Sequence, residues 1–413
     1  MRRRFAGFAA GMGVAAVQQS GGGYSLPSFT NRCGVAKYSC VAAPGAAIMS
    51  TMPDNAYRSA NGTSMAAPHA SGALAVVMER YPYMTNEQAL NVLFTTATKL
   101  DGSPQAAPDT LIGWGLINLE NAMKGPGQLL GRFNVNMPAN TRDEWKNGIS
   151  DTALLQRRAE DVAEQQAWAQ TLAAKGWQNG LPAGASQQDK TDYAVGMARA
   201  AAVAGGTFEG ITYKPRAYEG SLEKSGGGTL VLSGANSWRG ATLVSNGVLQ
   251  AGAVNTFSPV SAHSVAAGGV LDLASFNQSL ASLDNAGMVS LVGANPGTEL
   301  RVTGAYVGQF GSVIRLGTRP LLNGGSDKLV LDGANASASG NTRLQITNLG
   351  GLGGLTWGNG IVVVDARNGA KSTAQTSKNA FVLAGDVPMA FDPHVDAGAY
   401  EYRLFAADAN GSG

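Results

Sequence analysis

The pattern of apolar and polar residues divides the chain into three regions. Residues 1–124 mix helical and extended patterns, residues 125–220 are polar and rich in helix formers, and residues 221–403 alternate apolar and polar positions in short runs. We therefore expect a multidomain protein: a partial α/β domain, a helical and flexible connector, and an all-β solenoid, with a tail over residues 406–413.

Two helices are predicted in the first region. Residues 64–80 are apolar on nearly every face, which indicates a helix buried in a large core. Residues 85–97 begin with a capping box, in which Thr85 is the cap and Gln88 follows three residues later. Residues 41–51, "VAAPGAAIMST", predict a strand with a Pro-Gly turn.

The connector contains one clear helical segment. Residues 150–176 are good helix formers with a narrow apolar stripe, and Gly176 suits the C-terminal end. Such a helix could pack on a neighbouring domain or dimerise, but we favour a surface helix that links two domains. Residues 179–206 are rich in Ala, Gly and Gln, and we expect them to be mobile.

Short strands recur throughout the third region. The stretch 226–252, "GGGTLVLSGANSWRGATLVSNGVLQAG", predicts strands at 229–232, 241–244 and 247–250, each bounded by Gly, Asn or Ser. Similar runs follow, such as "GGVLDLASF", "TELRVTGAY" and "DKLVLDGAN". Each run has one apolar face that only neighbouring runs can bury, which favours a right-handed parallel β-helix. A β-sandwich is the alternative.

Composition excludes some classes of function. The chain has 413 residues, 14% of them charged, and a net charge of +2. Basic residues do not cluster beyond Arg2–Arg4, so no nucleic-acid partner is expected. No apolar run reaches about 18 residues, so no transmembrane helix is predicted. Residues 1–20 imitate a signal peptide, although we favour a buried strand there.

The two cysteines, Cys33 and Cys40, are separated by six residues. They can form a disulfide that closes a small loop, or they can remain free thiols. No second Cys or His pair accompanies them, so a metal site is not predicted, and no cofactor is expected.

The stretch 61–72, "NGTSMAAPHASG", carries the candidate chemistry. It presents Ser64 between small residues at the start of a predicted helix, where free backbone N–H groups and the helix dipole favour negative charge. A serine also needs a base in hydrogen-bond reach. His69 lies five positions later, about 500° around the helix, so we expect a buried structural histidine. His263 and His394 are expected at the surface or in turns of the solenoid.

The segments "NGTSMAAPHASGALA", "NRCGVAKYSCVAAPG" and "GWGLINLENAM" together resemble the nucleophile region of subtilisin-like serine peptidases. The resemblance covers about residues 8–124, and it favours the Cys33–Cys40 disulfide. It implies that Ser64 is the nucleophile and that its own backbone N–H is an oxyanion donor. The other residues of the matching motif are Gly62, Thr63, Met65 and Pro68.

The resemblance lacks part of the family's machinery. The family order is Asp, His, an oxyanion Asn and then Ser, but the 63 residues before Ser64 contain no histidine and no match to the Asp or Asn motif. We therefore expect the 413-residue chain to be inactive alone as a protease. A non-catalytic, adhesin-like β-helix with a remnant peptidase segment is the alternative.

The third region resembles the passenger of autotransporters, in the strand repeat 226–252 and in a pertactin-like stem over 324–405. This resemblance implies export through the outer membrane of a Gram-negative bacterium to the surface or the medium. The implied partners are protein substrates and the protein's own outer-membrane barrel, for which the sequence shows no match.

Overall fold

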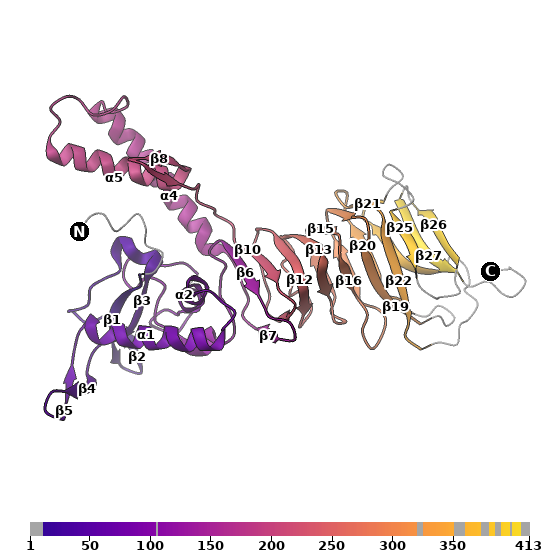
Figure 1. The fold of residues 1–413 in the computed structure, drawn as a ribbon, viewed down its shortest axis with the longest axis horizontal. Helices are drawn as coiled ribbons and strands as arrows, with labels where there is room; N and C mark the ends of the chain where they lie inside the picture. The colour runs from indigo at the N-terminus through magenta and orange to yellow at the C-terminus, as the bar shows by residue number, and fades with distance from the viewer. Residues whose placement is uncertain are drawn as a thin grey trace, which may run out of the picture.

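The computed structural model describes residues 11–104, 106–319, 325–350, 360–372, 380–384, 390–396 and 399–405. Residues 11–124 form an N-terminal lobe at one end of the molecule (Figure 1). A strand stack (residues 132–145 and 221–384) runs away from the lobe, and a helical arm (residues 152–213) projects from the junction between them. Residues 1–10, where a signal peptide was considered, lie outside the described residues.

The N-terminal lobe is built on a small sheet with helices against it. Strands β2 (Gly23–Ser25), β1 (Gly13–Ser20) and β3 (Cys40–Pro44) form the sheet, in which β1 and β3 are parallel. Helix α1 (Thr63–Arg80) contacts both parallel strands, and α2 (Asn86–Thr95) and α3 (Leu119–Ala122) contact α1. The capping box predicted at Thr85 and Gln88 is confirmed.

Helix α1 is buried on one face, so the prediction of a helix buried all round is wrong. Its buried side chains are Ala66, Ala70, Ala73 and Val77, which recur three or four residues apart. The side chains of Val76 and Met78 are 44% and 39% exposed. The sheet and α2 cover one side of the helix, and no described residue covers the opposite side to the same extent.

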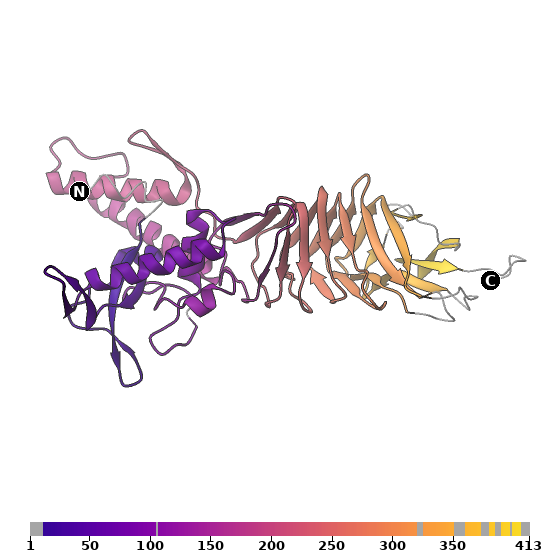
Figure 2. The same ribbon diagram turned by 60° about the horizontal axis from the view of Figure 1, so that its bottom comes forward.

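Three ladders of parallel strands form the strand stack (Figure 2). The first contains β6 (Arg132–Asn136), β10 (Ser221–Ser225), β12 (Thr242–Ala251), β13 (Ala262–Asp272), β15 (Ser282–Asn285), β18 (Ala305–Gly308), β21 (Ser337–Gly340) and β24 (Lys371–Ser372). The second contains β7 (Arg142–Trp145), β11 (Thr229–Leu232), the ends of β12 and β13, β16 (Met288–Ser290), β19 (Val313–Thr318), β22 (Thr342–Asn348) and β25 (Phe381–Ala384).

The third ladder contains β14 (Gln278–Leu280), β17 (Glu299–Val302), β20 (Lys328–Asp332) and β23 (Ile361–Arg367). Strands β27 (Ala399–Phe405) and β26 (Ala390–Asp396) then add to it in antiparallel order. The predicted parallel sheets are therefore confirmed. The predicted strands at 241–244 and 247–250 are one strand, β12, whose register shifts after Val244.

Apolar side chains stack from strand to strand inside the second ladder. The aligned positions Leu230, Leu249, Leu271, Val289, Ile314 and Leu344 are all fully buried. Burial of one such side chain stabilises a fold by roughly 1.5–3 kcal/mol. Because each strand covers its neighbour, the column holds the ladder in register.

The strand stack begins earlier than the sequence predicted. Strand β6 pairs with β10, and β7 pairs with β11, so residues 132–145 belong to the stack and not to a connector over 125–220. Within β6 the side chains of Phe133 and Val135 are buried between exposed neighbours. This period of two is the normal signal of a strand with one buried face. The helical arm is thus an insertion between the first two rungs.

The arm consists of α4 (Thr152–Lys175), α5 (Gln187–Ala204) and the hairpin β8 (Gly206–Phe208) and β9 (Ile211–Tyr213). Helix α4 ends at Gly176, as predicted, with φ of 70°. Helix α5 lies where we expected a mobile linker. Ser186 caps it, and a Cβ on Gly196 would lie 2.4 Å from the Trp168 ring, so only glycine allows this approach of α5 to α4.

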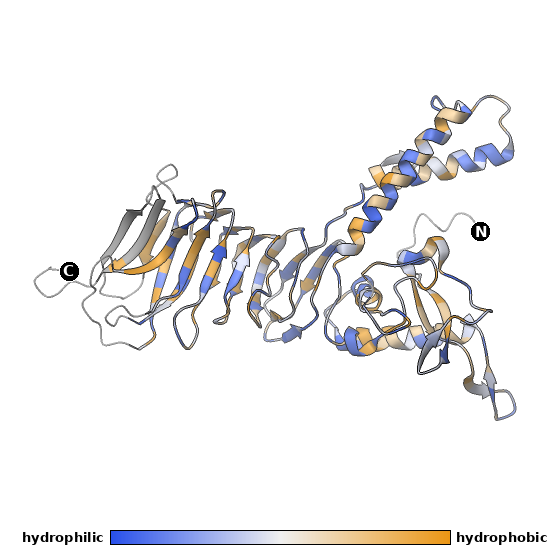
Figure 3. Cartoon of the chain, turned by 180° about the vertical axis from the view of Figure 1, so that it is seen from behind, coloured by the Kyte–Doolittle hydropathy of each residue, from blue (hydrophilic) through white to orange (hydrophobic). Residues whose placement is uncertain are grey.

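Figure 3 shows apolar and polar residues mixed along both arm helices. Leu155 and Val162 belong to the narrow apolar stripe of α4, and they are 45% and 48% exposed. None of the described helices combines the length and the apolar character needed to cross a membrane.

His263 is buried inside the stack, so the prediction of a surface histidine is wrong. It lies on β13 in register with Leu283, and its side chain packs beside Phe257. Its Nδ1 donates a 3.0 Å hydrogen bond to the Ser261 carbonyl, and its Nε2 has no partner among the described residues. Burial lowers the pKa of His263 to about 4.

We predict that His263 makes the chain less stable in mild acid. Its pKa is about 4 in the folded state, below its ordinary 6.5, so the unfolded chain takes up the proton first as the pH falls. The free energy of unfolding should therefore lose about 2–3 kcal/mol from this residue between pH 7 and 4.5. Urea unfolding of wild type and His263→Gln should show a smaller loss in the variant. His69→Gln is the matched control and should change nothing; equal pH dependence of all three would contradict the prediction.

Candidate active site around Ser64

Ser64 is the second residue of α1 and is exposed to solvent. The hairpin of β4 (Ile48–Met52) and β5 (Ala56–Ala60) leads directly into this helix and projects from the lobe (Figure 1). The Asn61 side chain accepts a 2.6 Å hydrogen bond from the Ala47 N–H, which joins the two ends of the hairpin. This hydrogen bond therefore fixes the backbone that leads from β5 into α1, on one side of Ser64.

Two glycines bring the start of α1 against the sheet. The Gly62 N–H donates a 2.8 Å hydrogen bond to the Gly45 carbonyl, and the Gly45 N–H donates a 2.9 Å bond to the Val17 carbonyl within β1. A Cβ on Gly45 would lie 2.6 Å from the Ala16 Cβ and 2.7 Å from the Gly62 oxygen. Only glycine permits this contact.

The first turn of α1 leaves a backbone donor available at Ser64. The Met65 and Ala66 N–H groups bond to the Gly62 carbonyl, whereas the Ser64 N–H donates to no described residue. Helix N-terminal N–H groups point outward and favour an anion. This geometry is compatible with the predicted role of the Ser64 N–H as an oxyanion donor. Pro68 has no N–H for the Ser64 carbonyl four residues earlier, which interrupts the helix ladder at this point.

The described histidines do not reach Ser64. His69 is exposed, so the expectation of a buried histidine is wrong, because it lies on the face of α1 that the sheet leaves open. Its Nδ1 bonds to the Met65 carbonyl at 2.9 Å, one turn earlier on the same helix. His263 is enclosed in the strand stack, and His394 lies on β26, where side chains are outside the described residues.

Cys33 and Cys40 form a disulfide around the short helix η2 (Gly34–Ser39). Cys40 begins β3, and its Sγ would lie 3.2 Å from a Cβ on Gly13 of β1. The disulfide therefore lies at the edge of the sheet that supports α1. Among the described residues, no group of three His, Cys, Asp or Glu side chains could hold a metal ion.

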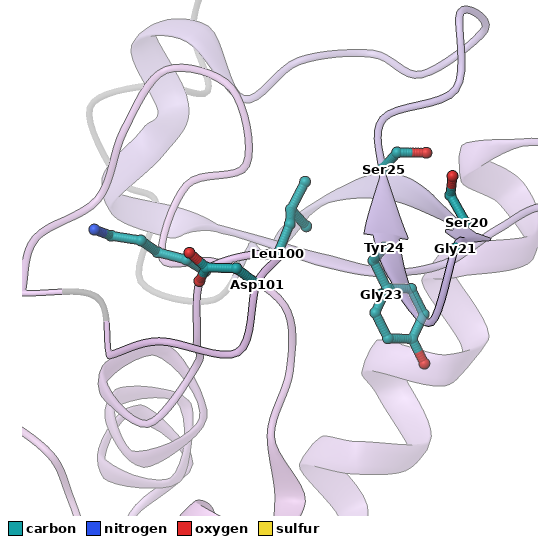
Figure 4. Close-up of a pocket in the computed structure, with 8 residues that line it drawn as sticks. Ser20, Gly21, Gly23, Tyr24, Ser25, Leu100 and Asp101 are labelled. Atoms are coloured by element: carbon teal, nitrogen blue, oxygen red, sulfur yellow. The ribbon is translucent and has the colours of Figure 1, made fainter.

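One hollow of the lobe lies away from the Ser64 motif. It has a volume of about 470 Å³ and is lined by the turn between β1 and β2 and by residues 99–101 (Figure 4). Tyr24 and Ser25 border it on one side, and Leu100 and Asp101 on the other. No residue of the motif 61–68 lines it.

Family comparisons divide the chain into the same parts. Residues 9–115 match the Subtilase family, residues 222–251 the Passenger-associated-transport-repeat, and residues 279–404 the Autochaperone Domain Type 1. Residues 9–115 are called the subtilase segment below, after this match.

Curated relatives match parts of the chain. Serotype-specific antigen 1 of Mannheimia haemolytica is 35% identical over 33% of this chain, and the Extracellular serine protease of Serratia marcescens is 28% identical over 52%. Subtilisin DY of Bacillus licheniformis is 46% identical over 20%. The chain spans only 15%, 20% and 28% of these relatives.

Among solved structures, fervidolysin from Fervidobacterium pennivorans is described as a keratinolytic enzyme related to subtilisin. It is 30% identical in sequence, with 28% of this chain and 19% of that chain covered, and the TM-score is 0.24.

We predict that the Gly45 contact holds the subtilase segment together. Gly45→Ala would force its Cβ into Ala16 and the Gly62 carbonyl and should lower the free energy of unfolding by about 1–3 kcal/mol in urea denaturation. Gly72→Ala is the matched control, because a Cβ there meets nothing within 4 Å on an exposed turn of α1. That control should be neutral or stabilising by up to about 1 kcal/mol. Equal effects of the two variants would contradict the assignment.

Proposed function

We propose that Ser64 is the nucleophile of a subtilisin-type endopeptidase site that cleaves proteins through an acyl-enzyme. The observation that carries the proposal is the exposed Ser64 at the start of α1, with its own N–H free, within a segment that matches the Subtilase family. The serine Oγ would attack the scissile carbonyl, and the Ser64 N–H would stabilise the negative oxygen of the tetrahedral intermediate.

The reaction needs a base to take the proton from the Ser64 Oγ. No described histidine lies in reach, so the 413 residues by themselves should not perform the reaction. In the subtilisin arrangement that base is a histidine held by an aspartate, and the proton returns from it to the leaving amine. We propose that these two groups belong to residues outside the sequence given.

We also propose that the three parallel ladders are the faces of a right-handed parallel β-helix, with domain limits near residues 124 and 403. The autochaperone and transport-repeat matches support an exported passenger that reaches the surface or exterior of a Gram-negative bacterium through its own outer-membrane barrel. Its partners would then be protein substrates. The absence of a described imidazole at Ser64 favours the second candidate, a non-catalytic adhesin-like passenger.

We predict that the 413-residue chain gives no fluorophosphonate labelling and no casein cleavage above a Ser64→Ala control. A product extended in frame upstream of Met1, if it carries the Asp and His motifs, should be labelled, and Ser64→Ala should abolish that labelling. The readouts are in-gel fluorescence of the probe and release of labelled peptides from casein.

Labelling of the extended product that survives Ser64→Ala would overturn the nucleophile assignment. Ser64-dependent labelling of the 413-residue chain would overturn its expected inactivity. An upstream frame with stop codons would favour the adhesin-like candidate.

A further inference from the structure

The helix that begins beside Ser64 ends against the first rung of the strand stack. Helix α1 extends for 18 residues to Arg80, so Ser64 and Arg80 lie about 24 Å apart along its axis. At the far end, the Arg80 guanidinium donates two hydrogen bonds to the Asp143 carboxylate on β7, of 2.9 and 2.6 Å. The two side chains are 33% and 10% exposed.

The position of Asp143 in the stack is unusual. It is in register with Leu230. Leu230 is the first side chain of the buried aliphatic column, which continues through five more fully buried side chains of the second ladder. An aspartate thus occupies the end of an apolar column, next to the N-terminal lobe. A buried carboxylate without partners is strongly unfavourable, so this position requires donors from the lobe.

Donors from the lobe and one backbone N–H of β7 saturate this carboxylate. The Tyr83 hydroxyl donates a 2.5 Å hydrogen bond to Oδ2, and the Glu144 N–H donates a 2.7 Å bond to Oδ1. With the two bonds from Arg80, four donors occupy the four lone-pair sites of a carboxylate. The hydrogen bond to Asp143 raises the pKa of Arg80.

The same contact is reinforced by aromatic packing. The Trp145 Nε1 donates to the Tyr83 hydroxyl at 3.0 Å, and the Arg80 guanidinium lies 4.4 Å from the centre of the Tyr81 ring. Gly125 allows the lobe to approach Trp145 closely, because a Cβ there would lie 2.8 Å from the Trp145 Cβ. The network therefore fixes both the distance and the orientation of α1 against β7.

We infer that Asp143 is a positioning residue for α1: the first rung of the strand stack holds the helix that presents Ser64, so this rung supports the site. The inference goes beyond the proposed function, because it concerns the placement of α1 whether or not Ser64 reacts. If the lobe were joined to the stack only by a flexible tether, no carboxylate with all four acceptor sites occupied would be expected where the two parts meet.

The test is hydrogen–deuterium exchange of the full chain, read by mass spectrometry on peptides from residues 62–80 and 262–272. Asp143→Asn and Arg80→Met should each speed exchange in the α1 peptide about tenfold or more and leave the β13 peptide unchanged. The double variant should be no worse than either single variant, because the two side chains act as one unit. Tyr83→Phe, which removes only one donor, should give a smaller rise in the same peptide.

Asp332→Asn is the matched control. Its salt bridge with Arg301 has a similar distance of 2.8 Å and a similar acid exposure of 12%, but it lies in the third ladder. It should leave the α1 peptide at the wild-type rate. The inference is overturned if Asp143→Asn or Tyr83→Phe leaves α1 exchange unchanged, if the rise is equal in the β13 peptide, or if the single effects add in the double variant. None of these readouts depends on the reactivity of Ser64.

Discussion

One continuous apolar cluster runs from the C-terminal half of α1 and from α2 into the strand stack, and the rest of the structure depends on it. Val77 and Tyr81 of the α1 end and Leu93 of α2 belong to the same buried cluster as Phe133 and Trp145 of the first rung. The first rung of a strand stack exposes apolar side chains and unpaired edges unless another element covers it. Here the subtilase segment covers the first rung. The C-terminal end of α1 packs into the shared core, and the N-terminal end presents Ser64.

Buried aspartates recur where the parts of the molecule meet. Asp143 joins the lobe to the stack through Arg80, and Asp151, at the base of the arm, accepts hydrogen bonds from the Gly220 N–H and from Arg239. Asp161 binds Arg216 and the Tyr218 hydroxyl, where the chain returns from the arm to β10. Each carboxylate is buried or nearly so, and therefore requires its partners in one geometry. These hydrogen bonds and ion pairs are directional, so they fix how the parts of the molecule are oriented. An apolar core alone would fix that orientation less specifically.

Local signals in the sequence predicted the elements well. The capping box at Thr85, the helix end at Gly176 and most short strands of the stack depend on neighbouring residues, so a pattern along the chain reveals them. The junction depends on residues far apart, such as Arg80 and Asp143, and no local pattern reports such a pair. The alternation of β6 was visible but lay in a polar region. His263 was misread because histidine is seldom fully buried, and no local pattern reported that this one is enclosed in the stack. The Ser64 motif was recognisable from sequence, whereas the exposure of His69 required the structure.

We expect the subtilase segment and the first rungs of the stack to unfold as one cooperative unit. The most direct measurement is native-state hydrogen exchange of the full chain in increasing urea, followed at α1 and at β11. If the core is continuous, the amides of both elements should exchange through the same unfolding event. Their free energies of opening and the dependence of these free energies on urea should then be equal. Exchange from α1 at low urea while β11 stays protected would show two independent units and would contradict the account.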